Sequence, residues 1–327
     1  MTEQEIRKVF SSFNGKKVLL IGDAMIDAYM WGRIERISPE APVPVVEIDE
    51  HEIRLGGSAN CALNIKSLGA NPILCTVIGN DNNGIKFEKL MKDANLSTDG
   101  VIISSNRKTT VKTRVISEEK HQIRVDEEDT HPINNTENQF IKKVDSLLEN
   151  TSIMILQDYN KGVLTKKIIK TLINKAKEKG IPVVVDPKKD NFLEYQECNI
   201  FKPNLKEIKE GISIEFDESK NEDIQKATSS LKDKLNAKAI LLTLSGRGIC
   251  INSEEGFVHT PSYIGSIVDV SGAGDTVISV ASLLLSDGVS YKNISKISSL
   301  SGGIVCQKVG VVPIDKEELL SETIKIF

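Results

Sequence analysis

A glycine-rich turn followed by an aspartate lies near the C-terminal end of the chain. The extended run 268–271 leads into Gly272-Ala273-Gly274, and Asp275 follows at once. From Val277 onward the apolar residues recur with helical spacing, so we expect the glycines at the N-terminus of a helix. Free backbone N–H groups at such a terminus attract an anion, and glycine lets a phosphate approach the backbone. Asp275 beside that phosphate could accept the proton of an attacking hydroxyl.

The glycines also allow other interpretations. On residue types alone, Asp275 could equally be an acid that only stabilises the first turn of a helix. The spacing Gly-x-Gly begins a dinucleotide-binding fingerprint, but Val277 stands where the third glycine belongs, which excludes that site. Gly79 and Gly84 begin like a phosphate-binding P-loop, but Ile85-Lys86 replaces the required Lys-Ser/Thr pair.

The composition excludes several classes of protein. The 327 residues are 39% hydrophobic and carry a net charge of −4, so the basic bias of a nucleic-acid-binding protein is absent. No apolar run approaches the roughly 20 residues of a membrane span, and the charged N-terminus does not resemble a signal peptide. The five cysteines are scattered and never spaced as Cys-x-x-Cys, which indicates reduced thiols. We therefore expect a cytoplasmic protein with no nucleic-acid or membrane partner.

Strands and helices alternate along most of the chain, which predicts an α/β fold with a mostly parallel sheet between two layers of helices. We expect strands at 16–22, 72–79, 153–156, 182–185, 199–202 and 239–243. We expect helices at 59–68, 82–93, 137–149, 166–179, 222–235, 273–287 and 291–307, another opening after residue 203, and a short strand and helix within 311–327. Polar residues follow most of these strands, at the edge where such a sheet binds ligands.

Two segments interrupt this alternation. Residues 31–55 contain three prolines and read as extended, and residues 100–127 contain three short alternating runs. We expect both segments to form a small sheet that covers a site as a lid. Lys112 and Arg114 lie two residues apart and therefore share one face of a strand, where they could hold a phosphate or simply be solvated.

Polar residues near the N-terminus could bind a sugar. Asp23 and Asp27 follow the first strand and could accept hydrogen bonds from hydroxyls, or could form an Asx turn. Gly56-Gly57 precede a helix that carries Asn60 in its first turn. Asn60 could bind hydroxyls, or the motif could be only a glycine-rich helix start.

The segment Asp-x-x-Gly-Ala-Gly-Asp-Thr that ends at Thr276 resembles the C-terminal signature of the ribokinase-like (PfkB) carbohydrate kinases. The resemblance covers nearly the whole chain and includes 56–60, Asn204-x-x-Glu207 and Thr243-x-Ser245-Gly246. Within this family, the run 36–46 and the motifs Asp158-Tyr159-x-Lys161-Gly162 and Asp186-Pro187-Lys188 are similar to the bacterial kinases of D-glycero-β-D-manno-heptose 7-phosphate.

The resemblance implies one ribokinase-like kinase domain over residues 1–327, a three-layer αβα fold with the lid at 31–55 and 100–127. It implies transfer of a phosphoryl group from ATP, with Mg²⁺, to the anomeric hydroxyl of the heptose phosphate during ADP-heptose synthesis for lipopolysaccharide. The resemblance implies that Asp275 is the base and that Gly272, Ala273 and Gly274 form the anion hole. It places Asn204 and Glu207 at the nucleotide phosphates and Mg²⁺, with Glu207 acting through water, and it places Thr243, Ser245 and Gly246 at the nucleotide. The residues implied at the sugar are Asp23, Asp27, Gly56, Gly57, Asn60 and Asp158, and those implied at its 7-phosphate are Lys112, Arg114 and Lys161.

Several points stay open at this level. Another sugar kinase of the family, for ribose, fructose phosphate or 2-keto-3-deoxygluconate, would share Asp275, and a non-catalytic sensor on the same fold is a less favoured alternative. Arg247 could contact phosphate or be solvated. Many heptose kinases carry a C-terminal nucleotidyltransferase, and the chain contains no His-x-Gly-His segment, so we expect another protein to supply that step. Apolar residues on both faces of the lid predict a homodimer in which two lids pack together.

Overall fold

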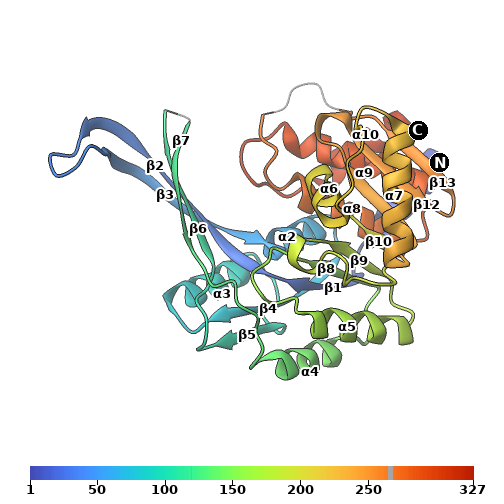
Figure 1. Ribbon diagram of the computed structural model, residues 1–327, viewed down its shortest axis with the longest axis horizontal. Helices are drawn as coiled ribbons and strands as arrows, with labels where there is room; N and C mark the ends of the chain where they lie inside the picture. The colour runs from blue at the N-terminus through green and yellow to red at the C-terminus, as the bar shows by residue number, and fades with distance from the viewer. Residues whose placement is uncertain (119, 264–267) are drawn as a thin grey trace.

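The computed structural model describes residues 1–118, 120–263 and 268–327. Its strands form two sheets, one of nine strands in the order β13-β12-β11-β10-β9-β8-β1-β4-β5 and one of four strands in the order β3-β2-β6-β7. Figure 1 shows the large sheet flanked by helices, with the small sheet extending from one end of this body as a long arm.

The nine-stranded sheet is parallel except for its last two pairings, β11 with β12 and β12 with β13. Its strands are β1 (Lys17–Gly22), β4 (Asn71–Gly79), β5 (Val101–Ser104), β8 (Ile153–Gln157), β9 (Val183–Asp186), β10 (Ile200–Phe201), β11 (Ala239–Thr243), β12 (Ile249–Ser253) and β13 (Gly256–Thr260). The mostly parallel sheet predicted from the alternation of strands and helices is confirmed.

Helices cover both faces of this sheet. They are α1 (Glu3–Ser12), α2 (Ser58–Ser67), α3 (Asn82–Asp93), α4 (Glu137–Leu147), α5 (Lys166–Glu178), α6 (Leu205–Ile212), α7 (Asn221–Leu235), α8 (Ala273–Ser286), α9 (Tyr291–Cys306) and α10 (Lys316–Ile326), with 3₁₀ turns η1 (Lys189–Asn191) and η2 (Ser245–Arg247). No helix in the described ranges combines the length and the apolar character that crossing a membrane requires.

The central strand β1 shows why the parallel strands read as continuous apolar runs. Val18 and Leu20 belong to the hydrophobic core on one face of the sheet, and Leu19 and Ile21 belong to the core on the other. All four side chains are fully buried. A strand with helices on both faces needs an apolar side chain at every position, because neither face meets water. The fold therefore has the three layers that were expected.

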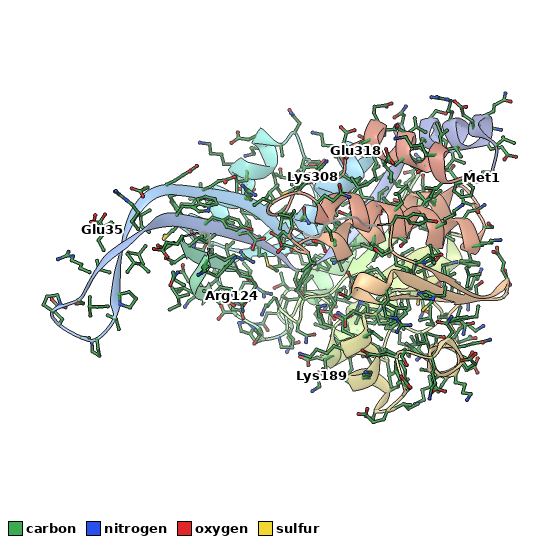
Figure 2. All side chains as sticks on the ribbon, turned by 90° about the horizontal axis from the view of Figure 1, so that it is seen from above. Met1, Glu35, Arg124, Lys189, Lys308 and Glu318 are labelled. Atoms are coloured by element: carbon green, nitrogen blue, oxygen red, sulfur yellow. The ribbon has the colours of Figure 1, made fainter. Side chains whose placement is uncertain are left out.

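The small sheet consists of β2 (Ala24–Ile37), β3 (Pro44–Gly57), β6 (Val111–Ser117) and β7 (Lys120–Glu127). The parallel pairing of β2 with β6 ends where Gly32 meets Ser117, and beyond that point β2 pairs only with β3. The outer part of β2 and β3 is thus a two-stranded ribbon, and Figure 2 shows it projecting from the body with Glu35 near its tip.

The structure corrects some sequence expectations. Residues 101–104, assigned to the lid within 100–127, pair in parallel with β4 and form the edge of the large sheet instead. The first lid strand, β2, begins at Ala24 rather than at residue 31. Residues 311–315 form no strand, and only helix α10 follows them. Helix α1 and the β12–β13 hairpin were not anticipated.

Candidate active site

A cavity of about 610 Å³ opens at the carboxyl ends of β9, β10 and β11. All nine residues that the sequence analysis placed at the nucleotide and the reacting phosphate line it, namely Asn204, Glu207, Thr243, Ser245, Gly246, Gly272, Ala273, Gly274 and Asp275. They come from the end of β11 and from the starts of η2, α6 and α8. The parallel sheet therefore gathers at one edge residues that are far apart in the sequence.

The glycine turn forms the start of helix α8. Gly272 has a φ of +78°, a left-handed conformation that glycine adopts without strain. A Cβ at this position would also lie 3.1 Å from Nδ2 of Asn60. Within the described ranges, no side chain caps the N-terminus of α8. The first N–H groups of the helix are therefore suited to receive an anion.

The carboxylate of Asp275 is buried and receives hydrogen bonds on both oxygens. Asn60 Nδ2 donates to Oδ2 over 2.7 Å, and the Tyr159 hydroxyl and Gln157 Nε2 donate to Oδ1 over 2.6 Å and 3.0 Å. Burial raises the pKa of Asp275 to about 6, although the hydrogen bonds from Tyr159 and Asn60 act to lower it. A carboxyl group with such a pKa is ionised at neutral pH and basic enough to accept a proton from a hydroxyl.

Behind Asp275 lies a second buried carboxylate, Asp186, at the end of β9. Gln157 Nε2 also donates to Asp186 Oδ2 over 3.0 Å, and Lys202 Nζ lies 3.0 Å from the same oxygen. The Lys202 side chain is only 5% exposed and lines the cavity beside the glycine turn. It brings a positive charge to the place where phosphate would bind.

The sequence analysis assigned no role to five residues of this arrangement: Gln157, Tyr159, Asp186, Lys188 and Lys202. Their signal was present, because each one ends a predicted parallel strand or follows it by at most three residues. Tyr159, Asp186 and Lys188 even stand in motifs quoted for the family resemblance. Position at a strand end marks a candidate but does not show which side chain turns toward the cavity.

Asn204 and Glu207 form a reciprocal cap on helix α6. The Glu207 N–H donates to Asn204 Oδ1 over 2.9 Å, and the Asn204 N–H donates to Glu207 Oε2 over 2.9 Å. The other carboxylate oxygen of Glu207 pairs with Lys188 Nζ. Both acidic oxygens thus have partners at the cavity wall, which fits an indirect contact of Glu207 with a metal ion better than direct ligation.

The residues described contain no cluster of three or more His, Cys, Asp or Glu side chains that could hold a metal ion. Magnesium at kinase sites is bound through one or two carboxylates together with substrate phosphates and water. The carboxylate of Glu207 at the cavity wall fits that mode of binding.

Asp23 is placed differently from the expectation that it faces a sugar. Its buried carboxylate accepts hydrogen bonds from the backbone N–H groups of Tyr159, Lys161 and Val163 at 2.9–3.0 Å. Burial raises the pKa of Asp23, although these three hydrogen bonds act to lower it. Asp23 therefore holds the loop that follows β8, and Gly57 packs against it so closely that a Cβ would lie 2.6 Å from the Asp23 carbonyl oxygen.

Two other residues expected at the sugar, Asp27 and Asp158, also have protein partners. Asp27 Oδ1 lies 2.6 Å from Arg114 NH1, and a Cβ on Gly56 would meet the other oxygen of this carboxylate at 2.1 Å. Asp158 Oδ2 accepts a hydrogen bond of 2.6 Å from the Tyr195 hydroxyl. Burial raises the pKa of Asp158 to about 6.

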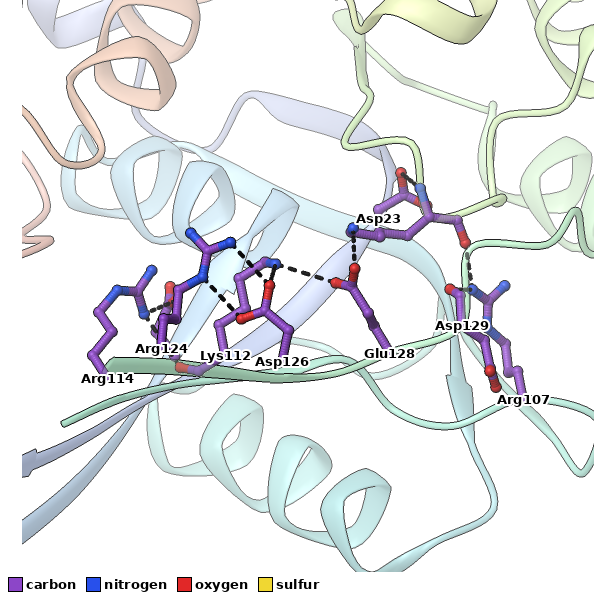
Figure 3. A network of polar contacts seen from close by, with 10 residues as sticks. Asp23, Arg107, Lys112, Arg114, Arg124, Asp126, Glu128 and Asp129 are labelled. Carbon is purple, nitrogen blue, oxygen red and sulfur yellow. Dashed lines mark hydrogen bonds and ion pairs between the residues drawn. The ribbon is translucent and has the colours of Figure 1, made fainter. Parts of the chain in front are cut away.

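The three cations expected at a substrate phosphate are all paired with carboxylates, and Figure 3 shows Lys112 beside Asp126 and Glu128. Lys112 Nζ lies 2.9 Å from Asp126 and 3.1 Å from Glu128, and Lys161 Nζ lies 2.7 Å from the other oxygen of Glu128. Arg114 pairs with Asp27. The structure thus brings Lys112 on the small sheet and Lys161 on the body to the same carboxylate.

Comparisons with known proteins agree with this geometry. The profile of the pfkB family carbohydrate kinases matches residues 15–317. The bifunctional protein HldE of Citrifermentans bemidjiense is 36% identical over 328 residues, which is 98% of this chain and 66% of that protein. The HldE protein of Helicobacter pylori is 35% identical over 305 residues, which is 93% of this chain and 65% of that protein. The chain thus spans about two thirds of the length of these curated relatives.

Solved structures share the fold at low sequence identity. Phosphofructokinase-2 from Escherichia coli in complex with fructose-6-phosphate superimposes with a TM-score of 0.77 at 17% identity, covering 94% of this chain and 99% of that one. Ribokinase from Arabidopsis thaliana complexed with ribose and ATP gives a TM-score of 0.73 at 18% identity, with the same coverage of 94% and 99%. The ribokinase-like fold expected from the sequence is confirmed.

Proposed function

The chain belongs to the pfkB family of carbohydrate kinases, and on this premise we propose that it transfers a phosphoryl group from ATP to the anomeric hydroxyl of D-glycero-β-D-manno-heptose 7-phosphate. The product would be the 1,7-bisphosphate, an intermediate on the route to ADP-heptose and lipopolysaccharide. The observation that carries the kinase chemistry is the position of Asp275, buried in the first turn of α8 at the wall of the large cavity.

The residues of the cavity support the following division of roles. ATP would lie along the ends of β9 to β11, with its terminal phosphate at the N–H groups of the glycine turn and near Lys202. Asp275 would take the proton of the anomeric hydroxyl as that oxygen bonds to phosphorus, and the bond between phosphorus and the ADP oxygen would break. Mg²⁺ would neutralise part of the phosphate charge, with Glu207 oriented toward it through water.

The heptose phosphate is favoured over other sugars by two features. The run 36–46 and the motifs around Asp158 and Asp186 resemble the heptose-7-phosphate kinases, and identity to HldE proteins extends over nearly the whole chain. Lys112 and Lys161 also converge on a single carboxylate, which is a geometry that a terminal phosphate could use. A charge-assisted hydrogen bond to such a phosphate contributes about 1.5–3 kcal/mol.

The small sheet would act as a lid that closes over the sugar and excludes water from the reaction. Its strand β7 is exposed along its whole length and carries Ile123 and Val125, which are 58% and 48% exposed. Large apolar side chains on an exposed sheet are a liability unless a partner covers them. We infer that the partner is the lid of a second copy, so that the enzyme is a homodimer.

The test is a kinase assay with a panel of acceptors: heptose 7-phosphate, unphosphorylated heptose, fructose 6-phosphate, ribose and 2-keto-3-deoxygluconate. We expect the highest kcat/KM with heptose 7-phosphate. Substituting Lys112, Arg114 or Lys161 by Met should raise KM for this sugar about ten-fold for at least one of the three, with little change in KM for ATP. Equal turnover of both heptoses would remove the 7-phosphate from the specificity, and preference for another acceptor would replace the heptose assignment.

A further inference from the structure

Glu128 bridges the small sheet and the body at the place where the substrate phosphate is proposed to bind. Its Oε2 lies 3.1 Å from Lys112 Nζ on β6, and its Oε1 lies 2.7 Å from Lys161 Nζ in the loop after β8 (Figure 3). Each carboxylate oxygen therefore has its own lysine. The two lysine side chains are 14% and 15% exposed, so both are largely buried.

This bridge has the form of a phosphate complex. A phosphate group presents pairs of anionic oxygens that accept charge-assisted hydrogen bonds from ammonium groups, as a carboxylate does. A pair of lysines held at the spacing of two carboxylate oxygens is therefore also suited to two oxygens of one phosphate. The chain itself supplies the anion that occupies this position in the structure.

We propose that Glu128 is an internal substitute for the terminal phosphate of the substrate, and that this phosphate displaces it from Lys112 and Lys161. The inference rests on the proposed function, because it assigns the substrate phosphate to these two lysines. Glu128 is then a specificity-determining residue: a sugar with a phosphate can break the bridge, whereas a sugar without one cannot.

The backbone around Glu128 limits what has to move in this exchange. The following residue, Asp129, is held by Arg107 NH2, which donates to its carbonyl oxygen over 3.2 Å, and by the Lys108 N–H, which donates to Oδ2 over 2.7 Å. Arg107 NH2 also donates to the carbonyl oxygen of Lys161. These contacts fix the backbone at Asp129 and at Lys161, so we expect the exchange to need only a rotation of the Glu128 side chain. This side chain is 21% exposed and can rotate toward solvent.

Lys161 is also well placed relative to the proposed base. Its N–H and that of Tyr159 both donate to Asp23 Oδ2, and the Tyr159 hydroxyl contacts Asp275. Tyr159 and Lys161 are two residues apart, so their Cα atoms are separated by at most about 7 Å. One sugar phosphate can therefore place its phosphate at Lys161 and its reacting hydroxyl near Tyr159 and Asp275.

Charge decides which anion is preferred. A phosphate monoester carries a charge of about −1.5 to −2 at neutral pH and offers three acceptor oxygens, whereas Glu128 carries one charge. Burial acts to raise the pKa of Glu128, but the hydrogen bonds from Lys161 and Lys112 outweigh it and leave that pKa below its ordinary value. The carboxylate therefore stays ionised and competes with a phosphate at every pH at which the enzyme would work.

The test is Glu128→Gln, which keeps the shape of the side chain and removes its charge. We expect KM for heptose 7-phosphate to fall about three-fold or more, and inorganic phosphate, titrated calorimetrically, to bind at least about three-fold more tightly. KM for ATP should not change. Glu127→Gln is the matched control, because it removes the same charge from the neighbouring residue, which is exposed at the end of β7. It should leave both values within about two-fold.

The outcomes separate this inference from the proposed function. If Lys112→Met and Lys161→Met weaken the binding of heptose 7-phosphate but Glu128→Gln leaves phosphate binding unchanged or weaker, Glu128 is a brace that positions the lysines and the inference is overturned. If neither lysine variant changes KM for the sugar phosphate, the phosphate site itself is wrong and the inference falls with it. Tighter phosphate binding by Glu128→Gln, lost again when Lys161→Met is added, supports the inference.

Discussion

The hydroxyl of Tyr159 donates a hydrogen bond of 2.6 Å to Oδ1 of Asp275, across 116 positions of the sequence. Because Gln157 also donates to Oδ1, that oxygen has two partners, whereas Oδ2 has only Asn60 among the described residues. Oδ2 therefore keeps more of its capacity to accept a further hydrogen bond, and we expect it to face the substrate hydroxyl. Tyr159 in turn belongs to the loop that Asp23 holds, so Asp275 and the loop carrying Lys161 are positioned together.

Replacing Tyr159 by Phe should shift the pH dependence of the reaction. Asp275 must be ionised to accept a proton, so kcat/KM of the parent should rise with pH through a midpoint near the pKa of about 6 and be lost below it. Loss of the tyrosine hydrogen bond destabilises the carboxylate, which raises its pKa and moves this acid limb to higher pH. The other titratable groups near Asp275 are Cys61, Asp186, Lys188 and Lys202.

The measurement is kcat/KM as a function of pH for the parent, Tyr159→Phe and Tyr291→Phe. Tyr291 begins helix α9 and does not line the cavity, so its variant should keep the parent midpoint. An acid limb that stays in place in Tyr159→Phe would show that the tyrosine does not act on Asp275.

Replacing Asp275 by Asn should lower kcat by about 10²-fold or more, which is the scale of a lost general base. Binding of ATP should be retained, because the glycine turn and the lysines remain. Steady-state kinetics together with calorimetric ATP titration check both statements. Asp287→Asn at the other end of helix α8 is the control, since Asp287 pairs with Lys16 away from the cavity. Turnover within a few-fold of the parent would exclude Asp275 as the base.

Replacing Glu207 by Gln should raise the Mg²⁺ concentration needed for half of the maximal rate. Glutamine at this position still serves the helix cap with Asn204, so the substitution removes the charge and keeps the start of α6. The measurement is the initial rate over a titration of Mg²⁺. Glu210→Gln on the same helix is the control: Glu210 pairs with the exposed Lys206, and its variant should leave the titration unchanged. The same titration curve for parent and Glu207→Gln would remove Glu207 from metal binding.

The exposed face of β7 should hold the dimer together. We expect the parent to sediment as a dimer at micromolar concentration and the double variant Ile123→Lys, Val125→Lys to sediment as a monomer, because charges on this face repel and cannot be buried. Ile85→Lys on helix α3 is the control: this side chain is 69% exposed, and its variant should remain dimeric. A monomeric parent would contradict the proposed lid contact.

The sequence located one half of the candidate site far better than the other. The proposed base Asp275 and the glycines are contiguous, so a single turn at a helix start defines their geometry. The cations are different: Lys112 lies opposite Asp126 in the ladder of β6 and β7, and no local pattern reveals that register. Asp23 follows a strand as a ligand-binding acid would, but whether its carboxylate meets a sugar or three backbone N–H groups depends on a loop about 136 residues away.

The misplaced segment 101–104 has a related cause. Its run of β-branched residues predicts a strand correctly, but membership in one sheet or the other depends on which edge is available. Here β4 offers an open edge on the large sheet, and β5 pairs with it through Thr76 and Val101. The chain then crosses to the small sheet only at Val111, where β6 begins.

The strand order of the large sheet also dictates the order in which a growing chain can fold. Strands β8 to β13 each pair with the next strand in sequence, so this half of the sheet can form as it is synthesised. Strand β1 pairs with β4 on one edge and with β8 on the other, where Val18 lies opposite Ile153. The edge that pairs with β8 therefore stays unpaired until about 130 further residues have been synthesised. At 5–20 residues per second that wait lasts roughly 7–26 s, during which an apolar strand edge stays open on the ribosome. We therefore expect the open edge of β1 to benefit from chaperone protection during translation.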